Sequence, residues 1–331
     1  MDNDMRVKLT KYMDDIRVKI EERIDEIVEK YEFGEMMAPI RYAVTGAAGG
    51  KKLRPTVATL LSQALGGKND SNTLEVAVIV EMIHQGSIVI DDMLDGDTER
   101  RGKPSLFMAE TLGNTMMGSF VMFLIANKIG AHRVPKAKDL VMDVVDKLAK
   151  GNVVEMLSKS WKEEDYNKMI YYKTAYLYEA AARFGAIMAD AHDDVIQVAA
   201  DYGKNIGMLY QVTDDLVDVL KSRNAGTPLG DMRRGKITLT MIRMYDCAGD
   251  KNPGIKQFLE RYSKKQMLPE ELTAFFQDCS RFKAIDYVQE IIAKYRSNAI
   301  ASAGCLPDNE YTQMLTCLPD YMIDALMAEV K

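Results

Sequence analysis

The stretch from Leu74 to Asp95 reads LEVAVIVEMIHQGSIVIDDMLD, an almost unbroken apolar run that ends in three aspartates. Its length and composition predict a buried helix. At about 100° per residue, Asp91 and Asp95 lie about 40° apart and one turn from each other. Ser87 and His84 continue the same stripe toward the start of the helix. One face of this helix therefore ends in two carboxylates.

A second segment repeats the arrangement. In NIGMLYQVTDDLVDVL (205–220), Gln211, Asp214 and Asp218 lie near one stripe of a second apolar helix. Asp215 is turned about 100° away from Asp214. The two aspartate clusters are about 120 residues apart.

Helix stability does not explain these clusters. Like charges one turn apart repel each other, and at the C-terminal end of the first helix the dipole also disfavours anions. A hard divalent cation does explain them, because magnesium binds carboxylate oxygens and keeps its other positions for waters and substrate phosphates. A solvated acidic patch is the alternative. Because there are two such clusters, each on an apolar helix, we favour the interpretation that they form two walls of one cavity.

Apolar residues recur at helical spacing through the rest of the 331 residues, and strand signals are weak. No linker, low-complexity tract or repeat divides the chain, so residues 1–331 are expected to form one all-α domain, a large antiparallel helical bundle. The predicted breaks between helices lie at residues 46–52, 66–72, 95–104, 132–138, 224–236 and 248–254.

Composition excludes several classes of protein. The formal net charge of −6 argues against a broad nucleic-acid surface. Four cysteines lie in the last third without a CxxC pair or interleaved histidines, which argues against a zinc site and a disulfide framework. The charged N-terminus lacks the apolar stretch of a signal peptide, and no long apolar run predicts a membrane span. A reduced, cytoplasmic location is expected.

Basic residues flank both aspartate clusters. Arg100 and Arg101 follow the first cluster in ERRGKP, and Lys236 follows the second in RRGK. Two further basic sets are GGKKLRP, with Lys51, Lys52 and Arg54, and YYKTAYLYEA, with Lys173 and Thr174. Guanidinium groups bind phosphate oxygens in bidentate fashion, and lysines act as point charges. Each residue alone is typical of a surface, but together with the carboxylates they indicate a phosphate site.

Five motifs occur in the order GGKKLRP, IVIDDMLDGDTERRGKP, KTAYLYEA, YQVTDDLVDV and GKITLT. In this order they resemble the motifs of the trans-isoprenyl diphosphate synthases, also called polyprenyl synthetases. The similarity runs from about residue 49 to about residue 323. It implies an all-α homodimer with a central cavity that lengthens an allylic diphosphate by head-to-tail addition of isopentenyl diphosphate.

The resemblance also implies roles for individual residues. About three Mg²⁺ ions would bridge the allylic diphosphate to Asp91, Asp95 and Asp214, with Asp92, Asp215 and Asp218 as ligands or in the outer shell. The allylic diphosphate would be held by Arg100, Lys173, Thr174, Gln211 and Lys236. The isopentenyl diphosphate would be held by Gly50, Lys51, Arg54, His84 and Arg101. The residues expected to carry the chemistry are Asp91, Asp92, Asp95, Arg100, Lys173, Asp214 and Lys236.

Two departures from the family pattern stand out. Thr227 occupies the place of a frequent lysine in the loop after the second cluster, where Arg233 or Arg234 are candidates to compensate, and Thr240 replaces the proline of GKxTLP. Two rival functions stay open. A class I terpene cyclase shares the first aspartate motif, but usually carries a second site of the form N-D-x-x-S-x-x-x-E. A silent subunit of a heteromeric synthase typically loses aspartates or arginines that this chain keeps.

The product length is predicted from the residues before Asp91. Gly86 and Ser87 are small, whereas farnesyl-length synthases of the family usually have an aromatic residue there. The path past Ile83 and Val80 is then expected to be open, which gives a geranylgeranyl or longer product. Candidates for the lower floor are Phe120, Met116 and Met117. The alternative is that Gly86 only permits close packing of two helices.

Overall fold

The first half of the chain is built almost entirely from helices. They are α1 (Asn3–Lys30), α2 (Met37–Arg41), α3 (Leu53–Ala64), α4 (Ser71–Asp95), α5 (Leu106–Ala109), α6 (Leu112–His132) and α7 (Lys138–Leu157). Short 3-10 or π-helical turns are η1 (Gly34–Met36), η2 (Tyr42–Gly46) and η3 (Pro135–Ala137).

The second half continues in the same way. Its helices are α8 (Glu163–Ile170), α9 (Tyr176–Met188), α10 (Asp193–Ala225), α11 (Gly230–Arg234), α12 (Leu239–Ala248), α13 (Pro253–Tyr262), α14 (Leu272–Arg281), α15 (Ala284–Ala303) and α16 (Glu310–Met327). The short turns are η4 (Tyr171–Ala175), η5 (Gly249–Lys251), η6 (Pro269–Glu271) and η7 (Ala328–Val330).

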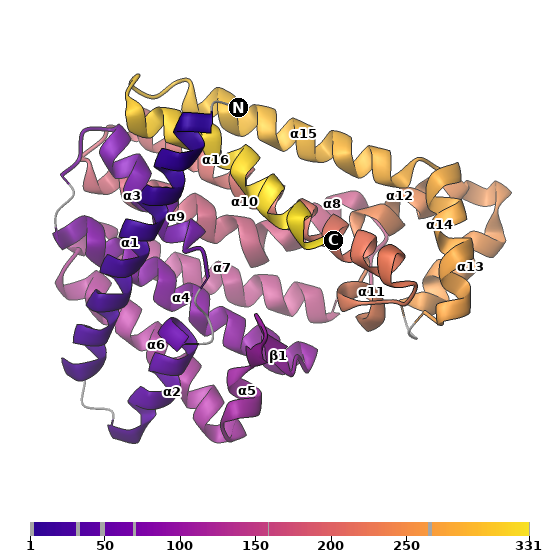
Figure 1. Ribbon diagram of the computed structural model, residues 1–331, viewed down its shortest axis with the longest axis horizontal. Helices are drawn as coiled ribbons and strands as arrows, with labels where there is room; N and C mark the ends of the chain where they lie inside the picture. Colours follow the sequence, from indigo (N-terminus) through magenta and orange to yellow (C-terminus); the bar gives the residue numbers. More distant parts are fainter. Residues whose placement is uncertain are drawn as a thin grey trace.

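This computed structural model describes residues 3–30, 34–46, 50–68, 71–157, 159–263 and 267–330. The all-α fold predicted from the sequence is confirmed, and the long helices lie side by side, with α12, α13 and α14 grouped at one end (Figure 1). The breaks predicted at 46–52 and 66–72 fall partly on residues 47–49 and 69–70, which lie outside the described residues.

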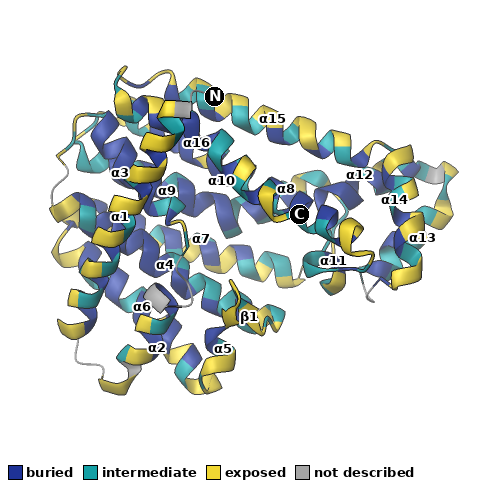
Figure 2. Ribbon diagram, in the orientation of Figure 1, coloured by how far each residue is buried: buried dark blue, intermediate teal, exposed yellow. Residues whose placement is uncertain are grey.

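Two helices with aspartate clusters form the middle of the packing. The long helix α10 packs most extensively against α9 and α15, and α4 packs most extensively against α6, with α3 and α9 also beside it. In Figure 2, α4 and α9 are mostly dark blue, whereas α15 alternates between buried and exposed residues. The apolar runs around both aspartate clusters are therefore explained by their burial in the core.

A two-stranded hairpin interrupts the helical pattern. Strands β1 (Glu99–Arg100) and β2 (Lys103–Pro104) pair antiparallel and are the only strands in the described parts of the chain. The turn between them has Arg101 at φ +53° and Gly102 at φ +74°, the left-handed conformations that a tight hairpin needs. This hairpin lies within the break predicted at 95–104, where the sequence analysis expected no strands.

Helix α4 is long and apolar enough to cross a membrane, and no other helix of the described ranges is. In the fold, 72% of its most hydrophobic window is buried inside the protein. Core helices of folded proteins share this composition, so the apolar run is accounted for by packing.

Candidate active site

The aspartates at the end of α4 face those in the middle of α10 across a cavity of about 330 Å³. Asp91 and Asp95 line it from α4, and Asp214 and Asp215 line it from α10. Helix α9 packs against both α4 and α10 and so joins the two walls. The structure thus brings together the two clusters that the sequence places about 120 residues apart.

Lys173 enters this cavity from the π-helical turn η4. A Cβ on Gly151 of α7 would lie 2.5 Å from the backbone nitrogen of Lys173, and one on Gly207 of α10 would lie 2.4 Å from the Cα of Ala175. Glycine is therefore required for both helices to approach η4. The resulting packing holds the ammonium of Lys173 3.7 Å from Oδ1 of Asp91.

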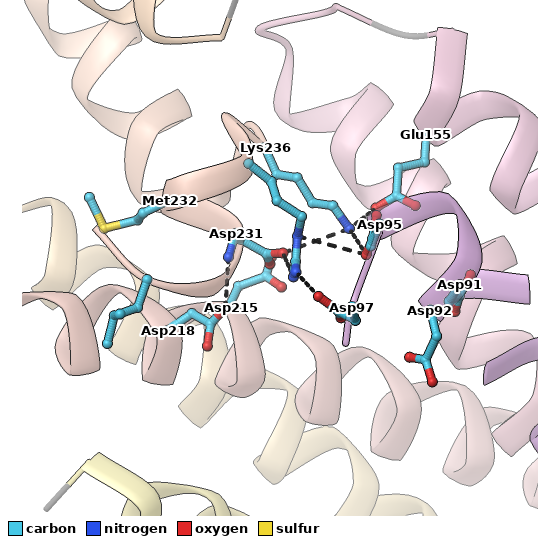
Figure 3. Close-up of polar contacts among 12 residues, drawn as sticks. Asp91, Asp92, Asp95, Asp97, Glu155, Asp215, Asp218, Asp231, Met232 and Lys236 are labelled. Carbon is cyan, nitrogen blue, oxygen red and sulfur yellow. Dashed lines mark hydrogen bonds and ion pairs between the residues drawn. The ribbon is translucent and has the colours of Figure 1, made fainter. Parts of the chain in front are cut away.

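Lys236 lies among three carboxylates that come from three helices (Figure 3). Its Nζ is 2.8 Å from Oδ2 of Asp95, 3.1 Å from Oε1 of Glu155 and 3.7 Å from Oδ1 of Asp231. Burial disfavours the ammonium, but the negative charges of Asp231, Glu155 and Asp95 outweigh burial and raise the pKa of Lys236. The side chain is therefore a cation held at the junction of α4, α7 and α11.

Asp92 is buried beside the hairpin and does not line the cavity. Nε of Arg100 donates to Oδ1 of Asp92 at 3.1 Å, and a second guanidinium nitrogen donates to the same oxygen. Arg100 does line the cavity. Asp92 is therefore linked to the cavity through Arg100, and its expected role as a metal ligand or outer-shell residue stays a prediction.

Both oxygens of Asp215 accept hydrogen bonds from neighbouring side chains. The hydroxyl of Tyr166 donates to Oδ2 at 2.6 Å, and Nε2 of Gln211 donates to Oδ1 at 2.8 Å. Oγ1 of Thr174 in turn donates to Oε1 of Gln211 at 2.6 Å. Burial and the nearby Asp231 raise the pKa of Asp215, while the hydrogen bonds oppose that effect. Thr174, Gln211 and Asp215 thus form one network linking η4 to α10.

Asp218 holds the start of helix α11. Its Oδ2 accepts from the backbone nitrogen of Asp231 at 2.9 Å. Gly230 has φ +46°, and a Cβ there would lie 1.9 Å from Oδ2 of Asp218, so only glycine allows this approach. One oxygen of Asp218 is thus engaged with the backbone, and its assignment as a metal ligand stays a prediction.

Helix α11 lies inside the break predicted at 224–236 and brings a further cation to the cavity. Arg234 is 2.7 Å from Oδ1 of Asp97 and 3.0 Å from Oδ1 of Asp231. Of the two arginines suggested to compensate for Thr227, Arg234 lines the cavity and Arg233 is exposed.

A second pocket of about 270 Å³ adjoins the first, and the two share Arg54, His84, Arg101 and Tyr210. A guanidinium nitrogen of Arg54 lies 3.0 Å from Nε2 of His84. Burial and the surrounding cations lower the pKa of His84 well below its usual value, so the neutral ring accepts this bond. A Cβ on Gly50 would lie 2.5 Å from a guanidinium nitrogen of Arg101, which is why that arginine can lie across the glycine.

The second pocket is also lined by Lys51 and Lys52. Nζ of Lys52 donates to Oε1 of Glu81 at 2.7 Å and to the carbonyl of Val44 at 2.9 Å, and both charged side chains are buried. Lys52 therefore fixes the segment just before α3 to Glu81 of α4 and to the backbone at Val44. All five residues expected to hold isopentenyl diphosphate, namely Gly50, Lys51, Arg54, His84 and Arg101, line this pocket.

The cavity carboxylates fit a divalent cation that is completed by other oxygen ligands. Oδ1 of Asp91 is buried and accepts no hydrogen bond. Burial raises the pKa of Asp91 to about 6, with Glu155 and Asp95 adding to it and Lys173 opposing it. Burial and the neighbouring carboxylates raise the pKa of Asp214 to about 7. Within the described ranges, no three His, Cys, Asp or Glu side chains are clustered closely enough to hold a metal alone.

The residues predicted to set product length are arranged differently from the expectation. Phe120 is 61% exposed on the outer side of α6, so it does not form a floor within this chain. Phe123 is the residue of α6 that lies against Gly86, because a Cβ on Gly86 would lie 3.1 Å from the tip of its ring. Ile83 and Val80 are fully buried, so the path predicted past Gly86 and Ser87 is filled.

The cavity residues that were not predicted from the sequence include Glu155, Tyr166 and Asp231. Glu155 lies in KGNVVEML, which reads as an ordinary amphipathic helix end. Tyr166 precedes KTAYLYEA at helical spacing, and Asp231 lies in the loop-like GDMRRGK. Of these three residues, only Asp231, two residues before the pair Arg233-Arg234, carried a recognisable polar signal.

Comparison with known proteins identifies the family. Residues 34–277 match the model of the polyprenyl synthetase family, which covers most of the chain. The chain therefore belongs to the polyprenyl synthetase family.

Individual relatives agree with this assignment. The chain is 30% identical to a geranylgeranyl diphosphate synthase of Methanosarcina mazei, over 92% of this chain and 94% of that protein. It is 28% identical to an octaprenyl diphosphate synthase of Haemophilus influenzae, over 86% of each chain. A geranylgeranyl pyrophosphate synthetase from Pyrococcus horikoshii has a similar fold, with a TM-score of 0.85, 24% identity and coverage of 96% of this chain and 99% of that one.

Proposed function

We propose that this chain condenses isopentenyl diphosphate with an allylic diphosphate, head to tail, and releases a longer trans-polyprenyl diphosphate and diphosphate. One observation carries the proposal: two aspartate clusters face each other across a cavity that adjoins a second pocket rich in cations. Two diphosphates can then lie side by side, with their reacting carbons between them. Membership of the family supports the same reaction.

On the allylic side, the cavity cations stabilise the departing diphosphate. Lys173, Lys236 and Arg100 line the cavity from three elements and take phosphate oxygens as the allylic C–O bond breaks. Thr174 and Gln211 orient the phosphate end through the network that includes Asp215. The bonding electron pair leaves with the diphosphate, and an allylic carbocation remains.

Asp91, Asp95 and Asp214 would hold Mg²⁺ here, because all three bring carboxylate oxygens to the cavity, and burial disfavours the charges of Asp91 and Asp214 unless a cation compensates them. When bound, the metal supplies positive charge next to the diphosphate oxygens. Asp218 would act through α11, since its carboxylate accepts from the backbone of Asp231.

On the other side, Arg54, Arg101 and Lys51 hold the diphosphate of isopentenyl diphosphate in the second pocket. His84 stays neutral and keeps Arg54 oriented. The isopentenyl double bond attacks the carbocation and forms the new C–C bond. The resulting cation loses a proton to the released diphosphate, the base that the family resemblance implies, so no protein base is required.

A direct experiment tests the reaction. The purified chain is incubated with Mg²⁺, labelled isopentenyl diphosphate and, in separate samples, dimethylallyl, geranyl or farnesyl diphosphate. Chromatography should show longer labelled prenyl diphosphates only when a primer and isopentenyl diphosphate are both present. A cyclic hydrocarbon formed without isopentenyl diphosphate would identify a terpene cyclase, and absence of turnover would identify a silent subunit.

We propose a geranylgeranyl or longer product. The names of the relatives range from geranylgeranyl to octaprenyl diphosphate synthases, which supports this range. Because residues 86 and 87 are glycine and serine, α4 has no aromatic side chain at the position expected to limit the product. The ring of Phe123, on α6, lies beside Gly86 instead. We therefore propose that a residue of α6 stops the growth of the product chain.

We also propose that the chain works as a homodimer. One stripe of α6, continued on α5, carries large apolar side chains that are about half exposed or more in the single chain. These are Met108, Leu112, Met116, Met117 and Phe120. Such a stripe is costly to leave in water and is typical of a helix that packs against a partner. A second copy of this chain would cover it.

A further inference from the structure

Glu155 has no part in the reaction described above, yet it contacts the two lysines of the allylic side. It lies in the last turn of α7 and lines the cavity. Its Oε2 accepts from Nζ of Lys173, and its Oε1 is 3.1 Å from Nζ of Lys236. The glutamate thus gives one oxygen to each lysine.

Local helix stability does not account for an anion at this position. The C-terminal end of a helix disfavours negative charge, and the side chain of Glu155 is only 22% exposed. The two ammonium groups are what compensate for that cost. Lys173 also faces Asp91 at 3.7 Å, and Lys236 also faces Asp95 at 2.8 Å, so the charges alternate in a chain across the cavity.

This arrangement occupies the cations that the diphosphate needs. An ammonium has three N–H donors and acts as a compact charge. A phosphate oxygen that approaches Lys173 or Lys236 competes with the carboxylate of Glu155 for the positive charge of that lysine. When the diphosphate leaves, Glu155 is already in place to receive both lysines.

We infer that Glu155 is a positioning residue that holds Lys173 and Lys236 when no diphosphate is bound and competes with diphosphate for them. It would weaken the retention of the diphosphate product and so favour its release. The inference rests on the proposed function in assigning the two lysines to diphosphate, but the competition itself is measurable without turnover.

The test is a calorimetric titration of the full chain with inorganic diphosphate in metal-free buffer containing a chelator. Glu155→Gln removes the charge and keeps the size, and it should bind diphosphate about tenfold more tightly than the wild type, as expected when charge-assisted hydrogen bonds no longer compete. Glu164→Gln removes the same charge from an exposed position on the neighbouring α8 and should leave the affinity unchanged.

Unchanged or weaker binding by Glu155→Gln would overturn the inference, because a purely structural glutamate or one that helps to bind diphosphate gives that result. Glu155→Ala is the second variant if the glutamine does not fold, and it too should bind more tightly. A turnover assay separates the two proposals: tighter diphosphate binding without any prenyl transfer by the wild type would leave this inference standing and reject the proposed function.

Discussion

Asp214 is a carboxylate whose charge the folded protein disfavours. Burial and neighbouring carboxylates raise its pKa from 3.8 to about 7. A raised carboxyl pKa contributes stability that is complete below about pH 4 and is lost as pH rises through about 7. Without metal, Asp214→Asn should therefore raise Tm by about 2–4 °C at pH 8 and leave it unchanged at pH 4.

Mg²⁺ should reverse the sign of this effect. At pH 8 the wild type is expected to gain thermal stability on addition of Mg²⁺ and diphosphate, because the ligand binds only the folded state. Asp214→Asn should lose most of that gain and at least about 100-fold in prenyl transfer. Equal ligand-induced shifts in the two proteins would contradict a role of Asp214 in metal binding.

The Tyr166 hydroxyl supports the second cluster and was missed by sequence reasoning. Tyr166→Phe leaves Oδ2 of the buried Asp215 without its 2.6 Å donor, which should cost about 1–3 kcal/mol and lower kcat about tenfold. Tyr245→Phe is the matched control, since it removes a similar bond to Glu260, at 2.8 Å, outside the cavity. Denaturant unfolding and steady-state kinetics measure the two effects. Similar losses in both variants would reject a specific role.

The sequence identifies the charged residues of the site better than their supports. Aspartates on otherwise apolar helices violate local preferences, so Asp91 and Asp214 are conspicuous without a structure. Glu155 and Tyr166 obey local preferences in amphipathic helices, and their role arises only when α7 and α8 pack beside the cavity. Contacts between distant helices of this kind leave no mark on local spacing.

At the scale of elements, α6 is expected to set the product length. Phe123→Ala should open the space beside Gly86 and shift the product by one or more isoprene units toward longer chains. Phe120→Ala changes a neighbouring phenylalanine that is 61% exposed, and it should leave the product length unchanged. Mass spectrometry of the dephosphorylated products distinguishes the two. The reverse result would restore the floor predicted from the sequence.

The sequence does not distinguish the places of Phe120 and Phe123, and the reason is physical. Both lie on one apolar helix whose stretch LGNTMMGSFVMF gives no clear polar face. Without a polar face, spacing does not tell which side of α6 meets α4. The structure decides it, since Ser119 donates to the carbonyl of Gly86 at 2.9 Å and fixes the rotation of α6. Likewise, the turn at Arg101 and Gly102 identified a break but not the paired strands around it.

At the scale of the molecule, helical periodicity and ordered motifs were enough to predict an all-α bundle. The cavity itself depends on how α4 and α10 are joined through α9, which periodicity does not specify. The resemblance of the motifs to those of a known family predicted that arrangement. Glycines at close helix contacts, such as Gly207, allow the helices to approach each other in this way.

The exposed stripe of α6 predicts the assembly of the whole molecule. A chain of 37.2 kDa should sediment at twice that mass if a second copy covers the stripe. Met116, which is 56% exposed, lies in its middle. Met116→Lys would place an unpaired charge in the interface and should shift the protein toward the monomer.

Leu268→Lys is the control. Leu268 is an apolar residue that is 48% exposed and far from α6 in the sequence, so this variant should stay dimeric. A monomeric wild type, or a Met116→Lys variant that is still dimeric at micromolar concentration, would show that this stripe is not the interface between copies.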